Sequence, residues 1–153
     1  MKKTKILRVL TIIMALCLMS VAFIGCDDED KNPNASCVVV LGNAVETAYT
    51  VELDNVSLEN GLLSILDYLK ENESLDYECD TSGYLTRVGD VAQDTSAGRY
   101  IYIYTSEPND QDVSQYATTI TYNGSTLVST GVGAKDMTIS NNTIIYIGTI
   151  VWQ

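Results

Sequence analysis

Residues 55–72, NVSLENGLLSILDYLKEN, decide the fold class, because here the apolar residues change from the spacing of a strand to that of a helix. They recur at steps of four, three, one and three, which places them on one face of an α-helix. These residues are Leu58, Leu62, Ile65, Leu66 and Leu69. We expect Ser57 to cap the N-terminus of the helix and Leu66 to lie near the centre of the core. Gly61 would lie inside the helix at a cost of about 1 kcal/mol relative to alanine, for which close approach to a strand is the usual reason.

Strand patterns lie on both sides of this helix. SCVVVLGN (residues 36–43) is a continuous apolar run, typical of a strand at the centre of a sheet. TAYTVELDN (residues 47–55) alternates, and Gly42-Asn43 predicts a hairpin turn between the two. Further strands are predicted in LDYECD, SGYLTRVGDV, GRYIYIYTSE, TTITYNGSTLV with a turn at Asn123-Gly124, and MTISNNTIIYIGTIVW with a turn at Asn141-Asn142. The sequence therefore predicts an α+β, β-grasp-like domain: an N-terminal hairpin, one helix packed on a mixed or antiparallel sheet, and further hairpins.

The N-terminus has the pattern of an export signal. Four basic residues lie within the first eight positions, an apolar run follows over residues 9–24, and FIGC ends at Cys26. The run is shorter than the roughly 20 residues that a membrane-spanning helix needs, so we predict a signal peptide over residues 1–25. FIGC resembles the bacterial lipobox, which implies that Cys26 carries lipid and anchors the protein on the extracytoplasmic side of a bacterial cell membrane. The alternative is a plain secretory signal with an incidental cysteine.

Acidic charge dominates the chain after the signal. Residues 26–35 are acidic, contain Pro33 and have no apolar residue before Ala35, which predicts a tether between the membrane and a domain over residues 36–153. The formal charge of the whole chain is −11, but four of its nine Lys and Arg lie in the signal. The remainder has five basic against twenty acidic residues, a net charge of −15. Such a protein is repelled by phosphate backbones, which excludes nucleic acid as its natural partner.

The cysteines leave one pair outside the signal and the anchor. Cys17 lies in the signal and Cys26 is the predicted lipidation site, so Cys37 and Cys79 remain. A disulfide between them would close a loop of about 40 residues and contribute about 3–4 kcal/mol, but it needs their strands to be adjacent. The alternative is two buried free thiols, which pack like small apolar side chains.

The stretch GRYIYIYTSE, residues 98–107, has two different faces. In a strand, Ile101 and Ile103 point to one side and Tyr100, Tyr102 and Tyr104 to the other. We expect the isoleucines to meet the helix. The tyrosines then either pack against neighbouring strands, through residues such as Tyr122 or Tyr146, or form a binding surface. Under the second alternative Tyr102, at the centre, contacts the ligand or partner.

No arrangement of catalytic or metal-binding residues is visible. The chain has no histidine, which excludes Ser-His-Asp and Cys-His catalysis and every zinc site that uses histidine. GVGAK at residues 131–135 lacks the spacing of a phosphate-binding loop and is interpreted as a connection between strands. Two acidic pairs, Asp90 with Asp94 and Asp110 with Asp112, are interpreted as solvated loops, with calcium as an option for the second pair. We therefore predict no catalytic residue, no metal site and no enzyme activity.

The order of these motifs resembles the transcobalamin-like C-terminal domain of bacterial surface proteins. The resemblance rests on the leucine face at residues 62–69, Tyr77, GYLTRVG at residues 83–89 and RYIYIY at residues 99–104, and it covers residues 36–152. It implies a β-grasp-like domain in a family whose bacterial members mostly have no assigned function. The eukaryotic domain contributes one side of a cobalamin site beside a helical domain, so cobalamin is implied as an alternative ligand. Tyr102 stands where that family usually has tryptophan.

Two functional classes remain. The first is a noncatalytic binding module, displayed on the membrane to capture a small ligand or another exported protein. The second is a structural or adhesive surface domain without a small-molecule pocket. A pocket beside the tyrosines would favour the first class, and a flat, fully paired sheet with charged edges would favour the second.

Overall fold

The computed structural model describes residues 34–42 and 44–152. The predicted signal peptide, the lipidation site Cys26 and all of the tether except Asn34 and Ala35 lie outside these residues. One α-helix, α2 (Leu62–Glu73), follows an N-terminal strand pair, β1 (Ser36–Leu41) and β2 (Thr47–Glu52). The later strands are β3 (Tyr77–Cys79), β4 (Leu85–Val88), β5 (Val91–Ala92), β6 (Arg99–Thr105), β7 (Thr119–Tyr122), β8 (Ser125–Ser129) and β9 (Ile144–Val151). The α+β class predicted from the sequence is confirmed.

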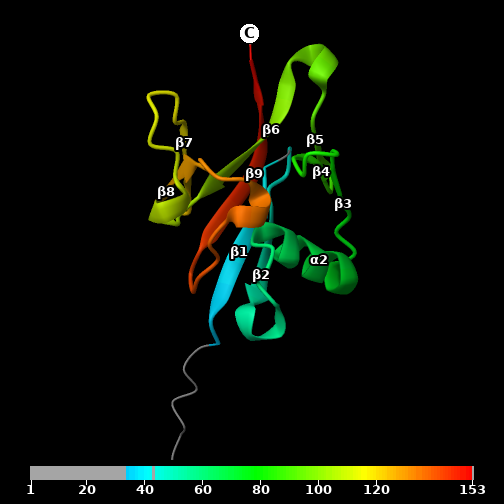
Figure 1. Cartoon of the computed structure of the whole chain (residues 1–153), viewed down its shortest axis with the longest axis vertical. Coiled ribbons are helices and arrows are strands. Elements are labelled where there is room, and N and C mark those ends of the chain that lie inside the picture. The colour runs from blue at the N-terminus through cyan, green and yellow to red at the C-terminus, as the bar shows by residue number, and fades with distance from the viewer. Residues whose placement is uncertain (1–33, 43, 153) are drawn as a thin grey trace, which may run out of the picture. The chain divides into compact units, whose positions relative to one another are not determined.

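The strands form two sheets. The larger has six strands in the order β2-β1-β9-β6-β8-β7, and the smaller has three in the order β3-β4-β5. β1 and β9 are parallel, with Val38 opposite Ile144, while the other neighbours in both sheets are antiparallel. Figure 1 shows β9 lying between β1 and β6, so the first and last strands of the domain are neighbours at its centre.

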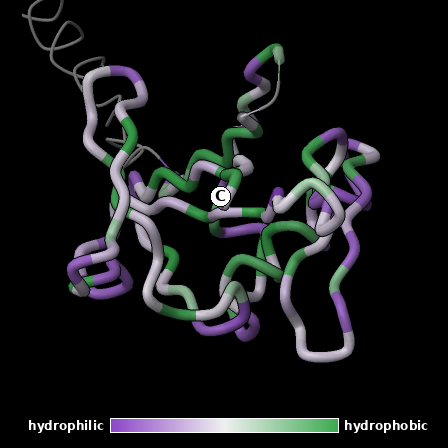
Figure 2. The backbone as a smooth tube through the Cα atoms, turned by 90° about the horizontal axis from the view of Figure 1, so that it is seen from above, coloured by the Kyte–Doolittle hydropathy of each residue, from purple (hydrophilic) through white to green (hydrophobic). Residues whose placement is uncertain are grey.

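The core lies between α2 and one face of the large sheet. Leu62, Ile65, Leu66 and Leu69 of α2 are at most 1% exposed, and they pack with Val39, Leu41, Ile145 and Ile147 of the sheet. Leu66 lies in this core as predicted. Figure 2 shows the same division along the chain, with hydrophobic colour inside and hydrophilic colour on the peripheral turns. No helix in the described part of the chain combines the length and the apolar character needed to cross a membrane.

The start of the helix differs from the prediction. Gly61 is the N-cap, with φ of +51°, and Ser57 makes no capping hydrogen bond. A Cβ atom on Gly61 would lie 2.6 Å from the carbonyl oxygen of Met137 and 2.7 Å from that of Lys135. The prediction of Ser57 as the cap is therefore wrong, because the helix can begin only after the chain has passed this backbone. The glycine is explained by close approach, but to a loop and a 3-10 helix, η4 (Ala134–Asp136), and not to a strand.

Two of the predicted hairpins are confirmed and one is wrong. β1 pairs with β2. β7 pairs with β8 across Asn123-Gly124, where both residues have positive φ, as a type I′ turn requires. Residues 137–140, which lead into the turn at Asn141-Asn142, do not form a strand. The N–H of Thr138 donates to a carboxylate, so it is not available for a ladder, and β9 pairs with β1 and β6 instead.

Cys37 and Cys79 are both free thiols. Cys37 lies in β1 of the large sheet and is buried, whereas Cys79 lies in β3 of the small sheet and is exposed. The two strands are not neighbours, so the condition for a disulfide is not met in this structure. The alternative of two buried thiols holds for Cys37 alone, and burial raises the pKa of its thiol to about 11.

Candidate binding groove

The three predicted tyrosines on β6 have three different environments. Tyr100 is 40% exposed, Tyr102 is half-buried and Tyr104 is 5% exposed. Ile101 and Ile103 are partly buried and pack against the core cluster, so the isoleucine face of the strand meets the core; that it meets the helix itself stays a prediction. The tyrosines therefore do not act as one flat surface, because the same face of the strand runs from solvent to the interior.

Aromatic rings continue this face beyond β6. Tyr102 lies between Tyr104, at 5.9 Å between ring centroids, and Trp152, at 6.3 Å. Tyr104 also contacts Tyr146 of β9, at 6.3 Å, in an edge-to-face geometry. Tyr122 of β7 lies 6.3 Å from Tyr146. Cross-strand packing thus accounts for the burial of Tyr104, and the sequence analysis missed Trp152 as part of this row.

Two glycines make room for the ring of Tyr146. A Cβ atom on Gly42 would lie 2.2 Å from its ring, and one on Gly148 would lie 3.2 Å from it. The hydroxyl of Tyr146 donates to Glu46 at 2.9 Å. Burial, followed by the Glu46 carboxylate, raises the pKa of Tyr146 to about 12. This end of the aromatic row is therefore fixed by packing and is structural.

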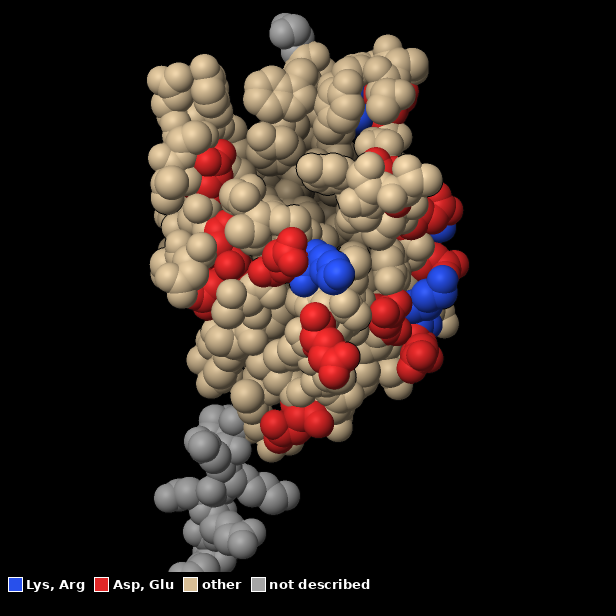
Figure 3. Space-filling model, in the orientation of Figure 1, with Lys and Arg blue, Asp and Glu red and all other residues tan. Residues whose placement is uncertain are grey.

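A groove opens at the other end of the row, beside Tyr102. It consists of two adjoining cavities, of about 210 Å³ and 480 Å³. Residues 101–103 of β6 line the smaller cavity, and Lys135 and Asp136 line the larger one. Both cavities share the lining residues Gly83, Tyr84, Thr130, Val132, Gly133 and Ala134. We call this space the β6 groove, and Figure 3 shows this face of the molecule hollowed between the β7–β8 hairpin and the small sheet.

The first wall of the β6 groove is the turn before β4. One carboxylate oxygen of Asp80 accepts from the N–H groups of Ser82, at 2.8 Å, and Tyr84, at 3.0 Å. Gly83 completes the turn with φ of +85° and has open space where a Cβ would lie. This turn holds Tyr84 at the rim, where it is 69% exposed. An exposed ring beside a cavity is available for contact with a ligand.

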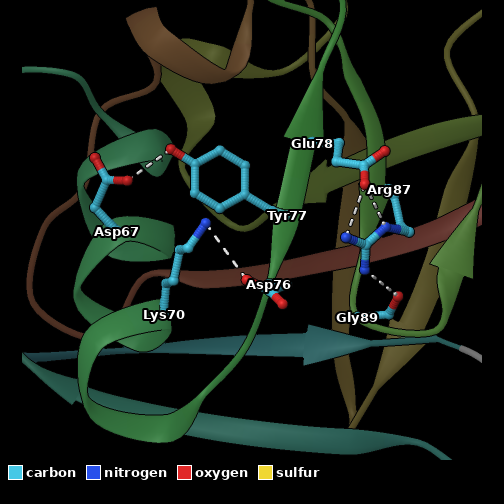
Figure 4. A network of polar contacts seen from close by, with 7 residues as sticks. All are labelled: Asp67, Lys70, Asp76, Tyr77, Glu78, Arg87 and Gly89. Atoms are coloured by element: carbon cyan, nitrogen blue, oxygen red, sulfur yellow. Dashed lines mark hydrogen bonds and ion pairs between the residues drawn. The ribbon is translucent and has the colours of Figure 1, made fainter.

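Polar contacts between α2 and the small sheet position this wall (Figure 4). Tyr77 donates its hydroxyl to Asp67 at 2.7 Å, and Lys70 lies 3.4 Å from Asp76. Within the small sheet, Arg87 donates to Glu78 at 2.9 Å. Exposed ion pairs of this kind contribute about 0–1 kcal/mol each. The contacts of Tyr77 and Lys70 connect α2 to the segment that leads into the turn.

The second wall, residues 130–134, is held by Asp110. The backbone carbonyl of Asp110 accepts from Gly131 N at 2.8 Å and from the hydroxyl of Thr130 at 3.1 Å. Its carboxylate accepts from the backbone N–H of Thr138 and, at 3.1 Å, from its hydroxyl. Asp110 is only 4% exposed, so its interpretation as part of a solvated loop is wrong. The residue links the loop after β6 to the start of this wall and to Thr138, which follows it in the chain.

The other acidic residues have local roles. Asp112 accepts from the N–H and the hydroxyl of Ser114, at 2.8 Å and 3.0 Å. Asp94 caps a short 3-10 helix, η2 (Thr95–Ala97), and the hydroxyl of Ser96, followed by the N–H of Ala97, lowers the pKa of its carboxyl. Within the described residues no three His, Cys, Asp or Glu side chains come together in a way that could hold a metal ion.

The chemistry of the β6 groove suits recognition of a largely uncharged group. The smaller cavity is lined by glycine, apolar and hydroxyl-bearing residues, among them Tyr84 and Tyr102. The larger cavity adds one basic and one acidic residue, Lys135 and Asp136. Tyr102 was predicted from the sequence as a contact residue, and it lines the smaller cavity. Tyr84 and the wall at residues 130–134 were missed, although the glycines of GVGAK were a signal that the backbone there approaches something closely.

Comparison with protein-family models, with curated proteins and with solved structures found no match. The resemblance to the transcobalamin-like domain therefore rests on the sequence motifs alone.

Proposed function

We propose that this protein is a noncatalytic binding protein, anchored by lipid on Cys26 to the extracytoplasmic side of a bacterial membrane, and that the β6 groove is its binding site. The observation that carries the proposal is the hollow beside Tyr102, with Tyr84 exposed at its rim. A pocket beside the tyrosines is what distinguishes a binding module from an adhesive domain with a flat, fully paired sheet.

Size and charge limit the ligand. The smaller cavity takes only part of a drug-sized molecule, since such molecules occupy pockets of about 300–1,000 Å³, and the adjoining larger cavity gives room for the rest. The net charge of −15 after the signal disfavours polyanions. We therefore propose a neutral or cationic ligand, either a small molecule or a segment of another exported protein. Cobalamin remains an alternative that rests on the sequence resemblance.

The finer assignment of the fold is also a proposal. We infer a β-grasp-like domain because an N-terminal hairpin precedes a helix that packs on a mixed sheet, with β9 parallel to β1 and β6 beside β9. The transcobalamin-like resemblance supports the same assignment through the leucine face and the Gly-aromatic segment before β4. Neither argument names a ligand.

A bulky residue at position 133 tests the site. Gly133 has φ of −71°, which any residue adopts, and a Cβ there would meet nothing nearer than Asp136 at 3.7 Å. Gly133→Trp should therefore fold and fill the β6 groove. Val113→Trp is the matched control, because Val113 is 97% exposed and lies outside the groove.

Binding is measured by saturation-transfer NMR with a library of neutral and cationic fragments. We expect fragments that bind the wild type and Val113→Trp, and lose binding to Gly133→Trp. Fragments that bind all three proteins equally would place the site elsewhere. If no fragment or peptide binds the wild type, the structural or adhesive function is favoured instead.

The anchor needs a separate experiment. The full chain is expressed in a bacterium, extracted from membranes with detergent, and its intact mass is measured. We expect a protein that begins at Cys26 and carries two or more acyl chains, since one chain alone anchors only marginally. Cys26→Ser should leave the membrane fraction. An unmodified Cys26, or a mature protein that begins at another residue, would refute the lipid anchor.

A further inference from the structure

β6 has a gap in its hydrogen bonding in the middle of the large sheet. On one side, β9 pairs with it along its whole length, from Arg99 to Thr105. On the other side, β8 pairs only with Tyr104 and Thr105. The stretch before these residues is an open strand edge, and residues 101–103 of that edge line the smaller cavity of the β6 groove.

The direction of the backbone groups at this edge follows from their neighbours. Gly98 accepts from Trp152 N, next to β9, whereas Arg99 exchanges two hydrogen bonds with Asp94 on the opposite side. Ile103 uses its carbonyl to accept from Thr130 N at 2.9 Å, again away from β9. Because alternate residues of a strand direct their N–H and C=O to the same side, Ile101 directs both toward the groove.

The gap therefore has defined ends. Asp94 occupies the edge beside Arg99, and Thr130 occupies it beside Ile103. Within the described residues, no hydrogen bond is made on this side by the backbone of Ile101 or by the N–H of Ile103. Unpaired strand edges of this kind bind other strands, and proteins usually cover or shorten them. Here the edge is left open at the floor of a groove.

The walls suit a polypeptide backbone. Gly83 and Gly133 present no side chain to the groove. The space that a Cβ atom would occupy is free of heavy atoms within 3.4 Å at both residues, so a second chain can approach their backbone closely. No charged side chain lines the smaller cavity. Around it, acidic side chains outnumber basic ones on the face in Figure 3. A segment with a neutral centre and basic flanks matches both features.

We propose that an extended segment of a partner protein, neutral at its centre and basic at its flanks, binds in the β6 groove by adding a short strand to the free edge of β6 at residues 101–103. The inference rests on the proposed function of the groove as a binding site and names the class of ligand. In this mode of recognition, main-chain hydrogen bonds give the affinity and alternate side chains give the specificity. Ile101 would exchange two hydrogen bonds with one residue of the added strand, and the ring of Tyr84 would lie over it.

The test begins with selection of a peptide. The full chain, anchored in nanodiscs of neutral phosphatidylcholine, is used to select binders from a phage-displayed library of linear heptapeptides. Binders that also bind Gly133→Trp are removed, and Val113→Trp serves as the control that must retain binding. We expect selected peptides to have neutral centres with lysine or arginine at the flanks.

The geometry is then read from the peptide and from the protein. Each residue of a selected peptide is N-methylated in turn, and its affinity is measured by calorimetry. We expect a loss of about five- to tenfold at one position only. The edge carbonyls of Arg99 and Ile103 already accept from Asp94 and Thr130, so the Ile101 carbonyl is the one left to accept an N–H of the added strand. Hydrogen–deuterium exchange of the Ile101 amide should be fast in the free protein and slower by at least about fivefold with peptide bound.

Each outcome separates this inference from the proposed function. If neutral fragments bind the groove but no peptide is selected, the binding site stands and strand addition is overturned. If peptides bind but no single N-methylated position lowers the affinity, or the Ile101 amide is unaffected, strand addition is also overturned. If neither fragments nor peptides bind the wild type, both proposals fail together.

Discussion

Gly61→Ala should destabilise the domain by much more than a usual surface substitution. Gly61 begins the helix with φ of +51°, a conformation that residues with side chains rarely adopt, and forcing one into it costs about 1–3 kcal/mol. The new Cβ would also lie 2.6, 2.7 and 2.9 Å from three backbone carbonyl oxygens, of Met137, Lys135 and Ala134. Backbone cannot rotate away as a side chain can, so either the helix or η4 must move, at about 1–3 kcal/mol.

The two contributions together give a loss of about 2–6 kcal/mol in the free energy of unfolding. A domain of this size has about 5–15 kcal/mol in all, so the variant should be close to unfolding at ordinary temperature. Two other glycines separate the contributions. Gly83 has φ of +85° but open space where a Cβ would lie. Gly83→Ala should therefore show the cost of the backbone strain alone. Gly133→Ala has neither problem and should be neutral or slightly stabilising.

Urea denaturation followed by far-UV circular dichroism gives all three values on one scale. We expect the order of loss to be Gly61→Ala, then Gly83→Ala, then Gly133→Ala. A loss for Gly61→Ala equal to that for Gly83→Ala would refute the close approach of the three carbonyls. A loss in the free energy of unfolding below about 1 kcal/mol for Gly61→Ala would also refute the strained start of the helix.

Three further predictions concern the core, the thiols and the aromatic row. Leu66→Ala should cost about 2–5 kcal/mol in urea denaturation, because Leu66 is fully buried, and an unchanged midpoint would mean that the helix stripe faces solvent. Iodoacetamide followed by peptide mass mapping should modify exposed Cys79 in the native protein, increasingly as pH rises, and buried Cys37 only after unfolding; equal absence of modification at both would indicate the disulfide. Tyr146 should ionise near pH 12, measured as the difference in tyrosinate absorbance between wild type and Tyr146→Phe. Since folding favours its neutral form, its contribution to stability should be complete below about pH 10 and be lost as pH rises toward 12, and a difference midpoint near 10 would contradict this.

Local patterns carried most of what the sequence could predict. The leucine spacing after Gly61 needs only neighbours three or four residues away, and the β7–β8 turn needs only Asn123-Gly124. The parallel pairing of β1 with β9 is different, because nothing within either segment states which distant strand it joins. The Asn141-Asn142 hairpin was wrong for the same reason. Its first arm met a local strand pattern, but the N–H of Thr138 was taken by a distant carboxylate.

Local sequence patterns could predict only part of the β6 groove. Alternation on β6 identified Tyr102, since a strand assigns its faces by period two. The walls are loops, and their positions depend on contacts such as that of Asp110 with Gly131 and Thr138. A buried aspartate and a solvated one have the same appearance in a sequence. Only the fold decides which hydrogen bonds it receives.

The parallel contact between β1 and β9 sets the order of events when this chain folds. Val38 and Ile144 are neighbours in the sheet although about a hundred residues separate them. Until residues 144–151 arrive, the β1–β2 hairpin and β6 have no strand between them, so the leucines of α2 have only half a surface to cover. Pairing over such a distance makes folding slow. We therefore expect the large sheet to close in one late step, after residues 144–151 have become available to pair with both β1 and β6.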